Sequence, residues 1–490
     1  MKCSIIGPTF EGRSTAIDSQ SCVNFYPEVS SSLEAKNVIA LIGTPGLKLF
    51  TSAGSGGNRG EFVTARQRLL TVIGNTLWEI NENKSATNRG TLNTHEGRVE
   101  FAEIQNTAVG MGGSQVMLVD GIYGYIFRTD TNVFVQITGN YTGGTSIVSI
   151  NGRFLQNVND TGTVIYSGLY DGLSWDIGGR NFVTEGSPDP VQAIKTINNE
   201  LWIFGTNSTE VWFSTPSAEE PFAKVNSGHI NTGVSGKYSV ATMQNQVIWL
   251  GSNVSGTGTI WQASGYLPDR ISNHAIEYII NKIDDISDCI CYSYNQEGHN
   301  FVVFNFISGN KTLVYDLTTQ MWHERASFDK LTGNNNRHRA ICAVLWNNKV
   351  MVGDYANNNI YEYGLDTYTD IGATIRRIRT APHIHQDRKR LFFRQFELDF
   401  ERGIGLLPTT SDTTSYDYKS DPQIMLSWSN DGGYTYSGEH WSTAGKIGER
   451  TCTASWNRLG KSRDRVFRIE CTAPVRWVLI DARMTTESED

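Results

Sequence analysis

The sequence has few charged residues, few prolines and no long apolar run. Charged residues make up 19% of the 490, and Pro numbers only 12. No apolar run reaches the eighteen or so residues of a membrane helix, so we predict no membrane-spanning segment. The apolar stretch at residues 4–6 is too short for a secretory signal, so we expect the chain to remain in the cytoplasm where it is made.

An excess of positive charge is also missing. Lys and Arg number 42 against 50 Asp and Glu, which gives a net charge of -8. This balance disfavours a general nucleic-acid binder. By our count residues 366–490 hold 18 basic and 18 acidic side chains, so residues 1–365 hold 24 and 32 and carry the whole negative balance.

Patterns of catalytic and metal-binding residues are lacking. The seven cysteines are odd in number and widely scattered, which argues against a disulfide framework. Cys289 and Cys291 fit a buried strand face better than a zinc site, because no second pair lies near. His383 and His385 lack a third ligand. No phosphate-binding loop or nucleophile elbow occurs. We therefore predict no catalytic residue, no cofactor and no metal.

Glycine and aromatic residues are abundant, and they recur with a period. Gly numbers 48, Trp 12, Tyr 20 and Phe 21. Polar turns that run into apolar strands recur seven times, 39 to 53 residues apart by our count. Their anchors are Gln67, Asn106, Gly152, Asn199, Gln246, His299 and Asn348. A second strand in each unit ends near an aromatic residue, at Trp78, Phe127, Tyr166, Trp212, Trp261, Tyr315 and Tyr361.

This period predicts the fold. Strand, turn and strand in about 40 to 50 residues is the length of a propeller blade, and stacking blades around an axis buries both faces of each sheet. We predict an all-β chain with an irregular six- or seven-bladed β-propeller, an N-terminal arm and a second C-terminal β domain. The expected parts are an arm with a leading strand at 1–50, the propeller at 51–365 and a sandwich-like domain at 366–490. A single large β-sandwich or jelly roll is the alternative.

One short motif resembles an Asp-box. Residues 429–436 read SNDGGYTY, which places Ser429, Asp431, Gly433 and Thr435 at the motif positions. In such a hairpin the carboxylate accepts bonds from turn N–H groups, and the glycines supply positive φ. We expect a structural turn, with a ligand site as the alternative.

A basic run lies between residues 376 and 394. We interpret it as a candidate inter-subunit face, because acidic neighbours and the negative net charge argue against a phosphate-neutralising surface. The residues are Arg376, Arg377, Arg379, Arg388, Lys389, Arg390 and Arg394.

Both ends of the chain resemble a known family. Residues 21–28 read SCVNFYPE and residues 44–47 read TPGL. Together with SNDGGYTY, RLG at 458–460 and RDRVFR at 463–468, they are similar to the tail hub, or nozzle, proteins of short-tailed bacteriophages, also called packaged-DNA-stabilisation proteins. The resemblance implies a ring of six copies below the portal and adaptor rings. It also implies contacts with a tail adaptor protein, fibres or spikes, and a needle or plug.

The resemblance and the residues support one functional hypothesis. We expect a non-enzymatic virion tail protein, assembled in the host cytoplasm. Its ring would retain packaged DNA and conduct it without specific binding, since an acidic or neutral lumen lowers phosphate affinity. The alternative is a sugar-binding or glycoside-hydrolysing, sialidase-like propeller, and a third interpretation is a monomeric cytosolic scaffold.

Overall fold

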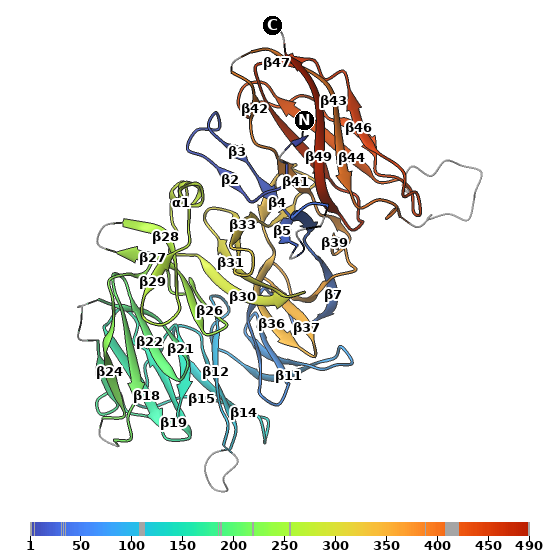
Figure 1. Ribbon diagram of the computed structural model, residues 1–490. Helices are drawn as coiled ribbons and strands as arrows, with labels where there is room; N and C mark the ends of the chain where they lie inside the picture. Colours follow the sequence, from blue (N-terminus) through green and yellow to red (C-terminus); the bar gives the residue numbers. More distant parts are fainter. Residues whose placement is uncertain are drawn as a thin grey trace.

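Seven blades surround one axis in the computed structural model, and a β-sandwich stands beside the ring (Figure 1). Five blades are sheets of four or five strands, and the other two are parts of larger sheets. The structure describes residues 2–3, 5–30, 32, 34, 36–106, 113–184, 186, 189–217, 220–253, 256–387, 389–406 and 421–488. Within these ranges the strands dominate, and the single α-helix is α1 (His274–Asn281), capped by Asn273. The predicted propeller is thus confirmed, with seven blades.

The strands of each blade follow one another antiparallel from the axis outward. The first four blades comprise β8 (Asn58–Val63), β9 (Leu69–Ile73), β10 (Thr76–Ile80) and β11 (Ala86–Thr91); β12 (Glu100–Ile104), β13 (Gln115–Val119), β14 (Gly124–Arg128) and β15 (Val133–Gln136); β16 (Ile147–Ile150), β17 (Arg153–Asn157), β18 (Thr163–Gly168), β19 (Asp171–Trp175) and β20 (Asn181–Val183); and β21 (Val191–Ile197), β22 (Glu200–Gly205), β23 (Thr209–Ser214) and β24 (Phe222–Ile230). The last three comprise β25 (Gly233–Val234), β26 (Val240–Met243), β27 (Gln246–Asn253), β28 (Gly256–Ala263) and β29 (Pro268–Arg270); β30 (Ile290–Gln296), β31 (His299–Phe306), β32 (Lys311–Asp316) and β33 (Met321–Glu324); and β36 (Ala340–Trp346), β37 (Lys349–Asp354), β38 (Asn359–Gly364) and β7 (Gly46–Ser52).

The repeat markers in the sequence coincide with equivalent places in the blades. The turn anchors lie between the first and second strands or, for Gln246 and His299, at the first residue of the second strand. The aromatic markers lie on the third strand of each blade. Positive φ at Asn198 and Asn199, and again at Asn347 and Asn348, explains the asparagine pairs, because a two-residue hairpin turn needs left-handed backbone there.

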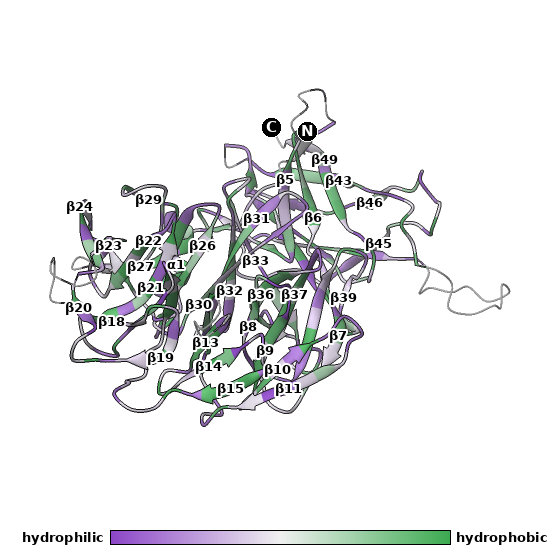
Figure 2. Cartoon of the chain, turned by 90° about the horizontal axis from the view of Figure 1, so that it is seen from below, coloured by the Kyte–Doolittle hydropathy of each residue, from purple (hydrophilic) through white to green (hydrophobic). Residues whose placement is uncertain are grey.

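Apolar residues between neighbouring blades form the propeller core. One buried cluster lies at each of the seven blade junctions, including the junction of the seventh blade with the first. Ile73 and Leu69 of the first blade meet Met351 and Trp346 of the seventh there. In Figure 2 hydrophobic residues concentrate on the blade strands. The ring is therefore closed by packing as well as by hydrogen bonds.

The outer strand of the last blade comes from the N-terminal part of the chain. β7 pairs antiparallel with β38, from Gly46 opposite Gly364 to Ser52 opposite Asn359. A strand from one end of the repeat thus completes the sheet formed at the other end. The hairpin of β39 (Thr369–Asp370) and β40 (Ala373–Thr374) extends this sheet beyond β7.

The C-terminal domain is a two-sheet sandwich that includes N-terminal strands. One sheet contains β46 (Ala454–Asn457), β43 (Leu391–Phe400), β49 (Val478–Ser488), β6 (Ile39–Gly43), β5 (Phe25–Val29), β1 (Lys2–Cys3) and β47 (Lys461–Ser462). The other contains β4 (Cys22–Val23), β41 (Arg377–Thr380), β48 (Asp464–Cys471), β44 (Gln423–Ser429), β45 (His440–Thr443) and β42 (Ile384–His385). Phe25, Phe396 and Phe467 contribute to the core between them.

The second sandwich sheet continues into the sixth blade. β4 lies between β33 of the propeller and β41 of the sandwich, so one sheet of ten strands crosses the domain boundary. Two small hairpins lie nearby, β2 (Phe10–Glu11) with β3 (Ser19–Gln20) and β34 (Ala326–Phe328) with β35 (Asn335–Arg337). The N-terminal segment therefore fastens the two domains together rather than extending from them as a free arm.

Candidate functional site

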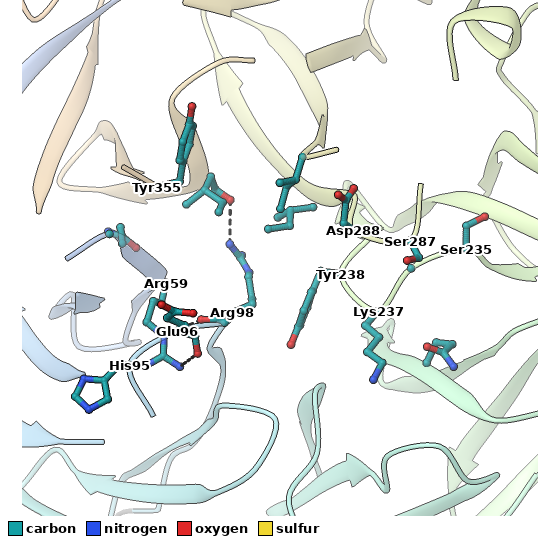
Figure 3. Close-up of a pocket in the computed structure, with 18 residues that line it drawn as sticks. Arg59, His95, Glu96, Arg98, Ser235, Lys237, Tyr238, Ser287, Asp288 and Tyr355 are labelled. Carbon is teal, nitrogen blue, oxygen red and sulfur yellow. Dashed lines mark hydrogen bonds between the residues drawn. The ribbon is translucent and has the colours of Figure 1, made fainter. Parts of the chain in front are cut away.

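A cavity of about 720 Å³ opens at one end of the propeller axis. Segments that lead into the inner strands line it, with Arg59 and Arg98 on the side of the first two blades. Tyr238 and Tyr355 come from the fifth and seventh blades, and Figure 3 shows both rings around the same space. Its volume is that of a small-molecule site.

Two polar contacts at this cavity join inner strands of blades that are not neighbours in the ring. Arg98, just before β12, donates through Nη1 to the carbonyl oxygen of Ile341 in β36, over 2.9 Å (Figure 3). Lys195 of β21 donates to Glu100 Oε2 over 3.1 Å, and Arg98 Nε lies 3.3 Å from Glu100 Oε1. These contacts join the second blade to the seventh and to the fourth. Each skips the blade between, so each spans a chord of the ring.

Pairing of the charges in this network outweighs the cost of their burial. The Arg98, Glu100 and Lys195 side chains are between 11% and 22% exposed. Burial alone would raise the pKa of Glu100, but Lys195 and Arg98 lower it below its usual value. Burial likewise disfavours the Arg98 charge, yet Glu100 raises the pKa of Arg98. The carboxylate is thus held ionised between two cations, as expected where a buried charge is paired.

A second buried carboxyl group lies beside the network. Glu61 of β8 accepts a 2.8 Å bond from Asn58 Nδ2, while its other oxygen has no partner among the described residues. Burial raises the pKa of Glu61 to about 8, and the bond from Asn58 and the charge of Arg98 offset this in part. A proton on Glu61 near neutral pH is the physical consequence.

The axial site is therefore a pocket lined by several blades. Side chains of three blades meet beside it, and a volume of about 720 Å³ has the size of a small-molecule site rather than of a passage for a nucleic-acid duplex. Glu100 is engaged by two cations, which leaves it poorly suited to act as a general base.

A second polar centre joins the two domains at Asn24. Its Nδ2 donates to the carbonyl oxygens of Ala326, over 2.9 Å, and Arg376, over 2.8 Å. Its Oδ1 accepts from the Ala326 N–H over 2.9 Å. Asn24 has a φ of 56°, which favours Asn or Gly over other residues. One side chain thus bonds the end of the sixth blade to the beginning of the sandwich.

Arg377 and Arg379 do not lie on an exposed face, and the prediction for these two residues is corrected. Both are fully buried, because β41 lies between β4 and β48 and the N-terminal segment covers it. The Arg379 guanidinium donates to the carbonyl oxygens of Ile5 and Pro8, and Arg377 Nη2 donates to that of Thr44 over 3.2 Å. They bind the chain's own N-terminal segment.

The other residues of the basic run lie apart from these two. Arg376 forms a bidentate pair with Glu470, with distances of 2.5 and 2.8 Å. Arg394 pairs with Glu487, while Lys389 and Arg390 are exposed. Arg388 lies outside the described residues. The structure does not gather the run into a single face, and an inter-subunit role for the exposed members stays a prediction.

The Asp-box residues are brought together in one turn after β44. Asp431 Oδ1 accepts from the Thr435 N–H over 3.0 Å, and Asp431 Oδ2 accepts from the Thr435 hydroxyl over 2.6 Å. Ser429 Oγ accepts from the Gly433 N–H over 2.8 Å and donates to Asp431 over 2.6 Å. Bonds from Ser429 and Thr435 lower the pKa of Asp431 to about 2. The carboxylate is occupied by its own turn.

The paired cysteines and histidines of the sequence lie in separate places. Cys289 and Cys291 are both buried, and burial raises the pKa of each thiol. His383 Nδ1 contacts Asp464 over 2.8 Å, while His385 is exposed. Over the described ranges no group of three or more His, Cys, Asp or Glu is arranged to hold a metal. No helix in that part of the chain is long and apolar enough to cross a membrane.

Sequence reasoning did not identify the Arg98–Glu100–Lys195 network or the role of Asn24. The network joins residues almost a hundred positions apart, and no local pattern marks them. Asn24 did leave a signal, since it lies inside the SCVNFYPE motif that carried the family resemblance. The structure places that motif at the junction of the domains.

Two family descriptions match the chain. "Bacteriophage P22 Gp10, beta-propeller" matches residues 13–368, and "Bacteriophage P22 Gp10, beta-sandwich" matches residues 376–487. No curated protein matches.

Several solved structures are similar at low identity. The RRP9 WD40 repeats are 9% identical with a TM-score of 0.41, over 66% of this chain and 98% of that chain. The extracellular domain of the one component system BT4673 from B. thetaiotaomicron is 10% identical with a TM-score of 0.41, over 88% of this chain and 58% of that chain. The N-terminal domain of Nup159 is 10% identical with a TM-score of 0.40, over 70% of this chain and 99% of that chain.

Proposed function

This chain belongs to the bacteriophage P22 Gp10 family, the tail hub and nozzle proteins of short-tailed phages, and from that premise we propose that its copies form a closed ring that retains packaged DNA and conducts it during ejection. As a member of this family the chain is a structural protein of the phage tail. The same proposal includes a role without catalysis and assembly in the host cytoplasm. It also includes docking of a tail adaptor protein, of fibres or spikes, and of a needle or plug.

The closed propeller axis is the observation that carries the ring. Arg98, Glu100 and Lys195 link inner strands of three blades, and in this proposal DNA has no path through a single copy. A bore wide enough for a duplex has to lie between copies. Copies joined head to tail close into a ring when the rotation between neighbours is an integral fraction of a turn.

The continuous sheet between the two domains supports a role in which the protein withstands mechanical force. The ten-strand sheet and the Asn24 bonds join the propeller, 51–365, to the sandwich, 366–490. Residues 1–50 contribute strands to both. In this proposal each copy moves as one body and resists the pressure of packaged DNA without hinging.

Mass in solution tests the proposal. The full chain is measured by light scattering and native mass spectrometry, alone and with the tail adaptor ring, and is then imaged by negative stain. We expect rings of about six copies, alone or on the adaptor. A chain that stays monomeric with the adaptor present overturns the ring.

The axial cavity favours a second candidate function, binding of a sugar or another small ligand. Tyr238 and Tyr355 supply aromatic surface beside polar groups, a composition typical of ligand pockets. A thermal-shift screen against a glycan panel tests it. A rise in melting temperature that Tyr238→Ala abolishes supports this function. If no glycan changes the melting temperature, the glycans of the panel are excluded as ligands.

A further inference from the structure

Cations gather at the end of the sandwich farthest from the propeller. We call this surface the basic tip and define it by five exposed residues, Lys389, Arg390, Arg458, Lys461 and Arg463. They come from the loop before β43, from β47 itself (Lys461) and from the chain on either side of β47. Figure 1 places β47 and the beginning of β43 at this far end.

Strand pairing brings the two segments together. Leu391 pairs with Ser462 and Phe392 with Lys461. The Phe393 N–H donates to the Gly460 carbonyl oxygen over 2.9 Å, and the Leu459 N–H donates to that of Phe393 over 3.0 Å. The cations are therefore held close by a rigid sheet edge, although they lie up to 74 positions apart in the sequence.

Carboxylates do not neutralise the tip. None of its five cations forms an ion pair with another described residue. Of the nearby carboxylates, Glu487 is paired with Arg394 and Asp464 with His383. Asp387, exposed in the same loop, is the remaining one among the described neighbours. Among the described residues the five cations of the tip lie near Asp387, Asp464 and Glu487, and Glu487 is already paired with Arg394, so positive charge is in excess there and a polyanion would be attracted.

The composition of the tip differs from that of a protein interface. Such interfaces have apolar cores and are depleted in Lys. Here Phe392, 37% exposed, is the large apolar side chain beside the cations, and the Lys461 ammonium lies 5.5 Å from its ring centre. The propeller and N-terminal segment have an acidic excess, so the tip is a local reversal of charge.

We propose that the basic tip binds the phosphate backbone of duplex DNA without reading its sequence. This inference rests on the proposed function, which places DNA beside the ring. Lys and Arg that neutralise phosphates release counterions, so log K falls with log salt by about 0.9 per contact, or about 4.5 for five contacts. One tip binds weakly, and several tips in one ring add through effective concentration.

Fluorescence anisotropy with a labelled duplex tests the proposal. The full chain is titrated at salt concentrations from 50 to 200 mM against two duplexes of unrelated sequence. One variant replaces all five tip cations with Gln (K389Q, R390Q, R458Q, K461Q, R463Q). A control variant changes five exposed cations elsewhere, so that its net charge is the same (R13Q, K48Q, R66Q, K282Q, K330Q). Thermal unfolding confirms that both variants fold.

The expected result is similar binding to both duplexes and a salt slope of about -4.5. The tip variant loses at least tenfold in affinity at the lowest salt, and the control variant changes less than about threefold. Equal losses in both variants overturn the proposal, as does absence of wild-type binding at 50 mM salt. Binding to anionic phospholipid vesicles without binding to DNA overturns it as well. Mass measured on the same samples reports ring formation separately, so failure of the tip and failure of the ring are distinguishable.

Discussion

Arg98 of the second blade donates a 2.9 Å hydrogen bond to the carbonyl oxygen of Ile341 in the seventh blade. The bond bypasses the first blade, so it joins inner strands that are not neighbours in the ring. Together with the bond from Lys195 to Glu100 it links three blades at their inner strands, and our proposal places the path of DNA between copies.

Removing the central carboxylate should destabilise the propeller. Glu100→Gln leaves Arg98 and Lys195 buried without a counter-charge, and we expect the free energy of unfolding in urea to fall by about 3 kcal/mol. Glu96→Gln, at the exposed rim of the same cavity, serves as the control and should change it by less than about 0.5 kcal/mol. Equal effects of the two variants contradict a structural role for the network.

Glu61 should make stability depend on pH. Its folded pKa of about 8 lies above the usual 4.5, so the folded state holds a proton that the unfolded state releases between these values. Stability therefore falls as the pH rises from about 4.5 to 8. Glu61→Gln should stabilise the chain by about 1 to 3 kcal/mol at pH 8 and by little at pH 4.

Urea unfolding at several pH values measures this effect. The exposed sandwich variant Glu439→Gln provides the comparison, and it should leave the pH profile unchanged. A Glu61→Gln profile parallel to that of the wild type would show that Glu61 ionises as freely in the folded chain as in the unfolded one, and would refute the raised pKa.

Asn24 should hold the two domains together through both its backbone and its side chain. Asn24→Gly keeps the left-handed backbone and loses three side-chain bonds, which we expect to cost about 2 to 3 kcal/mol. Asn24→Ala adds backbone strain and should cost about 1 kcal/mol more. Urea unfolding gives the two values, and proteolysis between the domains should accelerate in the same order. Equal free energies of unfolding for Asn24→Ala and Asn24→Gly would refute the predicted contribution of the left-handed backbone at this position.

The Asp-box carboxylate should titrate near pH 2 because its own turn stabilises the ionised form. NMR titration of Asp431 measures this pKa directly. Ser429→Ala removes the principal donor and should raise the pKa toward the usual 3.8. A wild-type pKa of 3.8 would contradict the hydrogen bonding described. The variant should leave ring assembly unchanged if the turn is structural.

The blades could be predicted from the sequence because each is local. A hairpin needs its turn residues within a few positions of its strands, so pairs such as Asn198 and Asn199 mark one blade without reference to the others. Two separate markers then gave the same period. The number of blades could be counted only in the structure. An irregular strand such as β26 gives the same sequence pattern in a ring of six blades as in a ring of seven.

Contacts distant in sequence could not be predicted in this way. The basic run was interpreted as one face because its members are neighbours in sequence. The structure buries Arg377 and Arg379 under residues 5–44, more than 330 positions away, while Lys389 and Arg390 reach solvent. Pairing of β7 with β38 and the bond between Arg98 and Ile341 are equally non-local, and a sequence pattern holds no information on either.

The measurement that tests the central claim most directly is an asymmetric cryo-electron microscopy reconstruction of the DNA-filled tail. We predict a closed ring of this chain, with DNA density on the ring axis between copies and side-chain density at Arg98, Glu100 and Lys195 filling each propeller. DNA density along the axis of a propeller, or copies that enclose no common bore, would contradict it.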